Sequence, residues 1–229
     1  MQSVLFRNRI EAANELAKRL KLLKEVQLEN KVKRNESATI VVAIPRGGIV
    51  IGNIIATELG TNLDLVVSRK IGAPFNPELA IGAVMPDGSY FLNDVAEMIN
   101  VSQDYIESQI RKEIKEIDRR LIEFRGNREY DNKLEDKIVV LVDDGIATGA
   151  TILASAKWIR DKHNCKQLII AVPLAPREIL EDLNRAADKV IVLHTPEPFG
   201  AVGRFYQDFN QVSDDEVKEI MKKYLPVYS

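Results

Sequence analysis

Short apolar runs alternate along this chain with longer segments in which apolar residues recur every three or four positions. A continuous apolar run is typical of a strand buried on both faces, and the longer spacing is typical of an amphipathic helix. We predict strands over 39–44, 63–67, 137–142, 168–172 and 189–193. Helical patterns separate most of these runs, and this alternation predicts parallel β-α-β units in an α/β fold.

Two segments interrupt the alternation. Residues 80–85 and 89–92 flank Pro86-Asp87-Gly88, and an Asp-Gly turn between two short strands predicts a β-hairpin. Residues 102–125 form the longest helical pattern, with apolar residues every three or four positions and charged residues on the opposite side. This apolar seam is consistent with a homodimer contact, and equally with a helix that lies on its own domain.

Composition places the chain among globular proteins. Of 229 residues, 32 are Lys or Arg and 34 are Asp or Glu, for a formal net charge of −2, and 45% are hydrophobic. We expect one domain over 1–229, with a core over about 38–193, a helical insertion at about 102–125 and a C-terminal hood at about 194–229. The single cysteine, Cys165, excludes an intrachain disulfide.

Charge and hydropathy also limit the partners. The balanced charge gives no strong signal for nucleic acid. Residues 7–34 carry nine basic and four acidic residues, which indicates either a solvated helix face or a contact with an anionic partner. No apolar run is long enough for a membrane span and the N-terminus lacks an apolar signal segment, so the expected location is the cytoplasm.

The residues with the clearest chemistry follow the third predicted strand. That run ends in Asp143-Asp144, and a loop with glycines and threonines over 145–151 leads into a helix. The free amides of a helix start and nearby hydroxyls bind an anion such as a monophosphate. Two carboxylates would repel a phosphate and suit hydroxyl groups or a metal ion instead. The segment therefore predicts a site for a phosphorylated sugar diol.

This segment resembles the phosphoribosyl pyrophosphate (PRPP) signature of the type I phosphoribosyltransferase family, and the resemblance extends from about Thr39 to Leu193. Pro45-Arg46-Gly47-Gly48 resembles the family's pyrophosphate loop, and Ser68-Arg69-Lys70 stands where its mobile catalytic loop begins. The whole chain is similar to a group of phosphoribosyltransferases without an assigned acceptor, which carry similar Arg-Lys-Ile-Gly-Ala-Pro and Asn-Pro-Glu stretches.

The resemblance implies a mostly parallel five-stranded sheet flanked by helices, with a flap hairpin and a C-terminal hood. It implies transfer of the 5-phosphoribosyl group from PRPP to a nitrogenous base or a related small-molecule acceptor, with release of pyrophosphate. It also implies Mg²⁺, held mainly through PRPP with Asp143 and Asp144 as further candidate ligands, and a non-proline cis peptide in the 45–48 loop. The residues so assigned are Asp143, Asp144, Arg69 and Lys70 for catalysis, Gly145, Ile146, Ala147, Thr148, Gly149, Ala150 and Thr151 for the 5′-phosphate, and Arg46, Gly47, Gly48, Arg69 and Lys70 for pyrophosphate.

Two further segments are candidates for covering the site. Residues 72–77 contain two prolines and a glycine, and we predict a lid there with no helix or strand pairing of its own. A closed lid would exclude water from the reacting ribosyl carbon. Glu78, Phe199, Tyr206 and Asp208 are candidates for the lid or the acceptor site, because aromatic rings stack on flat heterocycles. The same rings also suit ordinary packing.

Two other functions use the same residues. A PRPP- or nucleotide-sensing regulatory protein would bind the ligand without turnover, and a sugar-phosphate hydrolase or phosphorylase would not need a pyrophosphate leaving group. The sequence does not identify the acceptor.

Overall fold

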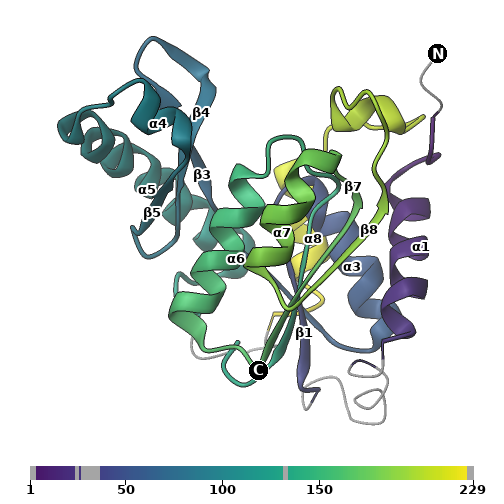
Figure 1. Ribbon diagram of the computed structural model, residues 1–229. Helices are drawn as coiled ribbons and strands as arrows, with labels where there is room; N and C mark the ends of the chain where they lie inside the picture. The colour runs from purple at the N-terminus through teal and green to yellow at the C-terminus, as the bar shows by residue number, and fades with distance from the viewer. Residues whose placement is uncertain (1–3, 24–25, 27–36, 131–133, 226–229) are drawn as a thin grey trace.

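The computed structural model describes residues 4–23, 26, 37–130 and 134–225. Its centre is a five-stranded sheet in the order β2-β1-β6-β7-β8, in which all neighbouring strands are parallel (Figure 1). The strands are β1 Thr39–Ala43, β2 Asn62–Leu65, β6 Ile138–Val142, β7 Gln167–Leu174 and β8 Lys189–His194. The predicted runs and the α/β fold with a mostly parallel five-stranded sheet are confirmed.

Helices cover both faces of this sheet. Helices α1 (Arg9–Lys21) and α3 (Gly47–Leu59) pack together on one face, and α6 (Ala150–His163) and α7 (Leu180–Ala186) lie on the other (Figure 1). A 3-10 turn, η2 (Arg177–Ile179), precedes α7. Because β1 and β6 are buried along their whole length, the sheet supplies the apolar centre against which these helices pack.

A second, antiparallel sheet forms a lobe beside the first (Figure 1). It contains β3 (Arg69–Ala73), β4 (Asn76–Val84) and β5 (Tyr90–Leu92), followed by α4 (Asp94–Met98) and α5 (Gln103–Arg125). The hairpin predicted around Pro86-Asp87-Gly88 is confirmed as β4–β5.

The prediction that residues 72–77 have no strand pairing is wrong, because these residues close a β3–β4 hairpin. Their role as a lid stays a prediction. The pairing moves from Gly72 opposite Ala80 to Ala73 opposite Asn76, so the ladder is irregular there. A side chain on Gly72 would come within 2.5 Å of the Pro77 carbonyl oxygen, which shows how closely the two strands approach. Pro77 lies in this irregular part of the ladder and is not paired there, so its missing N–H does not end the sheet.

Helix α5 lies on its own chain. The seam residues Ile106, Ile117, Leu121 and Phe124 are buried, and the helix contacts β3, β4 and α8 (Asp214–Met221). At its end the buried Arg125 guanidinium pairs with Asp64 of β2 through Nε–Oδ1 at 2.6 Å and Nη2–Oδ2 at 2.8 Å. The seam therefore serves intrachain packing, while a homodimer stays a prediction.

The chain after β8 folds back toward the N-terminus. Leu5 and Phe6 donate their amides to the Phe205 carbonyl at the end of the 3-10 turn η3 (Val202–Phe205), and Asp208 donates to the Arg7 carbonyl. Helix α8 then begins with a capping box between Ser213 and Glu216. None of the helices in the described ranges is both long and apolar enough to cross a bilayer.

Candidate functional site

The two segments predicted to bind phosphate groups meet where the strand order of the sheet reverses, between β1 and β6. From β1 the chain crosses through α3 to β2 on one side, and from β6 it crosses through α6 to β7 on the other. Helices α3 and α6 therefore both begin beside the carboxyl ends of neighbouring strands β1 and β6. In open α/β sheets this switch point is where ligands bind.

Residues 145–151 form an anion-binding loop at the start of α6. Gly149 caps the helix with φ +80° and no capping side chain, so the first amides of α6 remain available to a ligand. A Cβ at Gly149 would lie 2.6 Å from Ile179 Cδ1, so a side chain there would displace Ile179 as well as strain the left-handed backbone. Asp143 and residues 145–152 line a cavity of about 200 Å³, which gives room for a phosphate group.

The acidic pair stands directly beside this cavity. Asp143 Oδ1 accepts the Asp144 amide at 2.8 Å, and the Tyr206 hydroxyl donates to the Asp144 carbonyl at 2.7 Å. Burial and the neighbouring Asp144 charge raise the pKa of Asp143 well above its usual range. Burial also raises the pKa of Asp144, and the Arg9 guanidinium opposes that rise. Groups perturbed in this way are typical of functional sites.

The loop after β1 contacts the acidic pair through its glycines. A Cβ on Gly47 would lie 1.8 Å from Asp144 Oδ2, and a Cβ on Gly48 would lie 3.0 Å from Asp143 Oδ1. No larger residue fits at Gly47 without moving the Asp144 carboxylate. The peptide bond between Pro45 and Arg46 is cis, which confirms the expected non-proline cis peptide.

Arg9, the first residue of α1, was not identified by the sequence analysis. Its Nε pairs with Asp144 Oδ2 at 2.7 Å, its Nη1 donates to the Asn210 carbonyl at 2.8 Å, and its Cζ lies 3.8 Å from the centre of the Phe209 ring. The basic excess over residues 7–34 was the only signal, and it does not single out one arginine.

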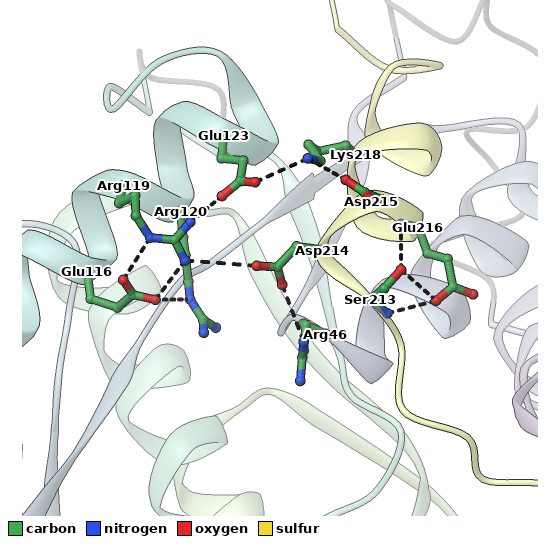
Figure 2. Close-up of polar contacts among 10 residues, drawn as sticks. All are labelled: Arg46, Glu116, Arg119, Arg120, Glu123, Ser213, Asp214, Asp215, Glu216 and Lys218. Atoms are coloured by element: carbon green, nitrogen blue, oxygen red, sulfur yellow. Dashed lines mark hydrogen bonds and ion pairs between the residues drawn. The ribbon is translucent and has the colours of Figure 1, made fainter.

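Arg46 belongs to an ion-pair network between α5 and α8 (Figure 2). Its Nη1 lies 3.4 Å from Asp214 Oδ1, and Arg119 of α5 approaches the other oxygen of Asp214 at 3.9 Å. The hydrogen bond from Arg119 lowers the pKa of Glu116 to about 2. Arg120, Glu123, Asp215 and Lys218 complete the network, and Figure 2 also draws the separate capping box of Ser213 and Glu216. The Arg46 side chain is thus paired with the C-terminal helix, while the next two residues of its loop, Gly47 and Gly48, contact the acidic pair.

The basic pair at the start of the hairpin is held within its own lobe. Arg69 Nε lies 2.8 Å from Glu113 Oε2 of α5, and Lys70 Nζ lies 3.0 Å from Glu78 Oε2. Within the described ranges, neither cation forms an ion pair with Asp143 or Asp144. The sequence assigns Arg69 and Lys70 to catalysis and pyrophosphate and Glu78 to the lid or the acceptor site, whereas the structure pairs Lys70 with Glu78 and Arg69 with Glu113 of α5.

The candidate acceptor residues of the hood mainly contact other residues of the hood. The Tyr206 ring stacks on Phe209 with centroids 4.9 Å apart, and Phe199 contacts Phe205 at 5.2 Å. Asp208 is exposed and accepts the Asn210 side-chain amide at 2.6 Å. Tyr206 is therefore next to the acidic pair, whereas Phe199 and Asp208 contact other parts of the hood.

The donor set fits a magnesium ion carried by the substrate. No group of three or more His, Cys, Asp or Glu residues that could hold a metal occurs in the part of the chain that the structure describes. Asp143 lines the cavity, and the next residue, Asp144, offers a second carboxyl group beside it. Mg²⁺ is commonly bound by one or two carboxylates together with substrate phosphates, so this pair suffices if the ligand supplies the other oxygens.

Comparisons with known proteins agree with this geometry. A model of the phosphoribosyl transferase domain matches residues 12–197. Two curated proteins of Mycobacterium tuberculosis, named "Putative phosphoribosyl transferase MT0597" and "Putative phosphoribosyl transferase Rv0571c", are 40% identical over 214 residues. The match covers 93% of this chain and 45% of each relative, so the chain spans less than half their length.

A solved structure is similar over nearly the whole chain. The crystal structure of TT1426 from Thermus thermophilus is 33% identical with a TM-score of 0.76, and the match covers 96% of this chain and 99% of that one. The family model, the curated relatives and the fold agree: this chain belongs to the type I phosphoribosyltransferase family.

Proposed function

We propose that this protein transfers the 5-phosphoribosyl group from PRPP to a nitrogenous base or a related acceptor and releases pyrophosphate. One observation carries the proposal: Asp143 and the loop over 145–151 border a single cavity at the switch point of the sheet. An anion-binding loop beside two carboxyl groups is complementary to a sugar that carries a phosphate and a diol.

The residues divide the substrate between them. The amides of 147–151 and the Thr148 and Thr151 hydroxyls bind the 5′-phosphate, and Asp143 and Asp144 accept the ribose hydroxyls. The amides of Gly47 and Gly48, at the start of α3, and the Arg46 guanidinium bind the pyrophosphate. In this assignment the ribose lies between the two helix starts, with its C1 carbon toward the 45–48 loop.

The chemical step breaks the bond between C1 and the pyrophosphate oxygen and forms a bond between C1 and the acceptor nitrogen. The electron pair of the broken bond leaves with pyrophosphate, so negative charge grows on that group. Cations and helix amides fixed at that place stabilise the charge. Mg²⁺ bound with PRPP supplies further positive charge at the pyrophosphate oxygens. Arg69 and Lys70 are the remaining cations assigned to this role.

Pyrophosphate release tests the proposal. PRPP and Mg²⁺ are incubated with the protein and with a panel of purine, pyrimidine and nicotinate-type acceptors, and pyrophosphate is measured for each. We expect release that depends on one acceptor class. Release without any acceptor would indicate a hydrolase. PRPP binding without release on any acceptor would favour the sensing function, and absence of both binding and release would overturn the proposal.

A further inference from the structure

Arg9 forms an ion pair with Asp144 that is not needed to hold the N-terminal helix in place. The helix is already anchored by its buried apolar face, which consists of Ala12, Ala13, Leu16, Ala17 and Leu20. The preceding residues pair with the hood through the Phe205 carbonyl. The Arg9 side chain, only 11% exposed, adds an ion pair to an acid of the ligand site. A guanidinium is costly to bury without a partner, so this placement depends on Asp144.

The contacts of Arg9 and Gly47 fix the orientation of the Asp144 carboxylate. Arg9 Nε lies 2.7 Å from Asp144 Oδ2 on one side. On another side Gly47 approaches the same oxygen so closely that a Cβ on Gly47 would lie 1.8 Å from it. Arg9 itself is fixed by the Asn210 carbonyl and the Phe209 ring. The carboxylate is therefore held between the N-terminal helix, the hood and the 45–48 loop, instead of turning freely at the end of β6.

We propose that Arg9 is a positioning residue for the sugar site: it orients the Asp144 carboxylate toward the ribose hydroxyls and couples the hood segment around Phe209 to that orientation. The inference rests on the proposed function, because it presumes a ribose at the acidic pair. Arg9 itself does not touch the 145–151 loop in this scheme, so phosphate binding is independent of it.

That independence makes the inference testable with three ligands. Calorimetry compares ribose 5-phosphate, 2-deoxyribose 5-phosphate and inorganic phosphate on the wild type, on Arg9→Met and on Arg7→Met. Arg7 is the matched control, because it is an exposed arginine two positions away whose hydrogen bonds to the other described residues come from its backbone and not from its side chain.

We expect the wild type and Arg7→Met to prefer ribose 5-phosphate over its deoxy analogue. In Arg9→Met this preference should fall about tenfold, because the charge-assisted contact that orients Asp144 is lost. The affinity for inorganic phosphate should stay within about twofold, since the loop amides are unchanged. A merely structural role would lower the melting temperature and weaken all three ligands together.

Each other outcome has a definite meaning. A wild type without preference for the ribose diol would overturn the proposed sugar site, and this inference with it. A normal wild type and an Arg9→Met variant with the same preference would overturn the inference alone. If Arg9→Met does not fold, Arg9→Lys decides, because an ammonium lacks the second arm that reaches Asn210. Its preference should fall at least about threefold, and a wild-type preference in folded Arg9→Lys would overturn the inference.

Discussion

The sheet edge at which the carboxyl ends of β1 and β6 lie and the hairpin lobe of β3, β4 and β5 differ in how deeply they bury their charged residues. At the sheet edge, Asp144 and Arg9 are 16% and 11% exposed and are surrounded by the starts of two helices and the hood. In the lobe, Lys70 and Glu78 are 47% and 89% exposed and lie on a hairpin. Both regions pair a cation with an acid, but the first pair is mostly buried and the second is exposed. In the proposed function the sugar-phosphate half of the site is therefore already assembled, whereas the lobe cations exchange partners to bind pyrophosphate.

This difference orders the expected effects of substitution. A buried charge that loses its partner is costly, whereas an exposed ion pair contributes about 0–1 kcal/mol. The largest effects are therefore expected at the sheet edge, and the smallest in the lobe.

Asp144→Ala should have the largest effect. The variant removes an acid assigned to the ribose and leaves Arg9 without its partner, so pyrophosphate release should fall by about 100-fold or more. Steady-state rates with the acceptor found above measure it. Asp161→Ala, an exposed acid on α6, is the control and should keep its rate. Undiminished PRPP binding and turnover in a folded Asp144→Ala protein would contradict the site assignment.

Gly149→Ala tests whether the anion loop is fixed by its backbone. The variant combines a left-handed conformation, which costs about 1–2 kcal/mol, with a Cβ placed 2.6 Å from Ile179. Gly126→Ala is a close match, because Gly126 has φ +74° and nothing within 4 Å of its Cβ position. Urea unfolding should show a loss of about 2–4 kcal/mol for Gly149→Ala and about 1–2 kcal/mol for Gly126→Ala.

Phosphate affinity separates the two glycine variants further. Displacing the start of α6 should weaken inorganic phosphate binding about tenfold in Gly149→Ala, since several amides lose their alignment together. Gly126→Ala, at the far end of α5, should bind phosphate like the wild type. Equal phosphate affinity in both variants would mean that the loop does not hold the anion.

Features of the fold that depend on consecutive residues can be predicted from the sequence, and features that depend on pairing between segments are harder to predict. The parallel strands, the β4–β5 hairpin and the segment from Asp143 to Thr151 can be predicted, because each is written in consecutive residues with a clear periodicity or motif. The pairing around 72–77 is missed because local Gly and Pro content suggests a loop, while β4 extends the ladder across them.

Contacts between distant residues are beyond such a prediction. Arg9 and Asp144 are 135 positions apart, and Arg46 and Asp214 are 168 apart. Nothing near Arg9 in the sequence marks its role, because the packing of α1 against α3, β7 and β8 brings it to the end of β6. The partners of the predicted site residues depend on tertiary structure, although the residues themselves can be found from motifs.

The pair between Arg69 and Glu113 should have an intermediate effect. If Arg69 leaves Glu113 to bind pyrophosphate, the Glu113 carboxylate competes with the ligand for the same guanidinium. Arg69→Met should then weaken pyrophosphate binding about tenfold, and Glu113→Gln should strengthen it about threefold, because a charge-assisted pair becomes a neutral one. Titration calorimetry with pyrophosphate and Mg²⁺ measures both.

Glu107→Gln controls for the loss of a negative charge on α5. Glu107 pairs with Arg111 on the exposed side of the helix, so its removal should leave pyrophosphate affinity unchanged. Weaker binding in Glu113→Gln would show instead that Glu113 positions Arg69 for the ligand, and the contrast between the two regions would then disappear.

Glu78→Gln should have the smallest effect. Its partner Lys70 is half exposed and Glu78 almost fully so, and water and salt screen such a pair. We expect less than about 0.5 kcal/mol in urea unfolding and less than a twofold change in pyrophosphate affinity. The result is compared with that of Glu113→Gln, because each variant removes one carboxylate that pairs with a cation assigned to pyrophosphate. If Glu78→Gln strengthens binding as much as Glu113→Gln, exposure does not decide which lobe cations are available, and Lys70 is as firmly held by its acid as Arg69 is.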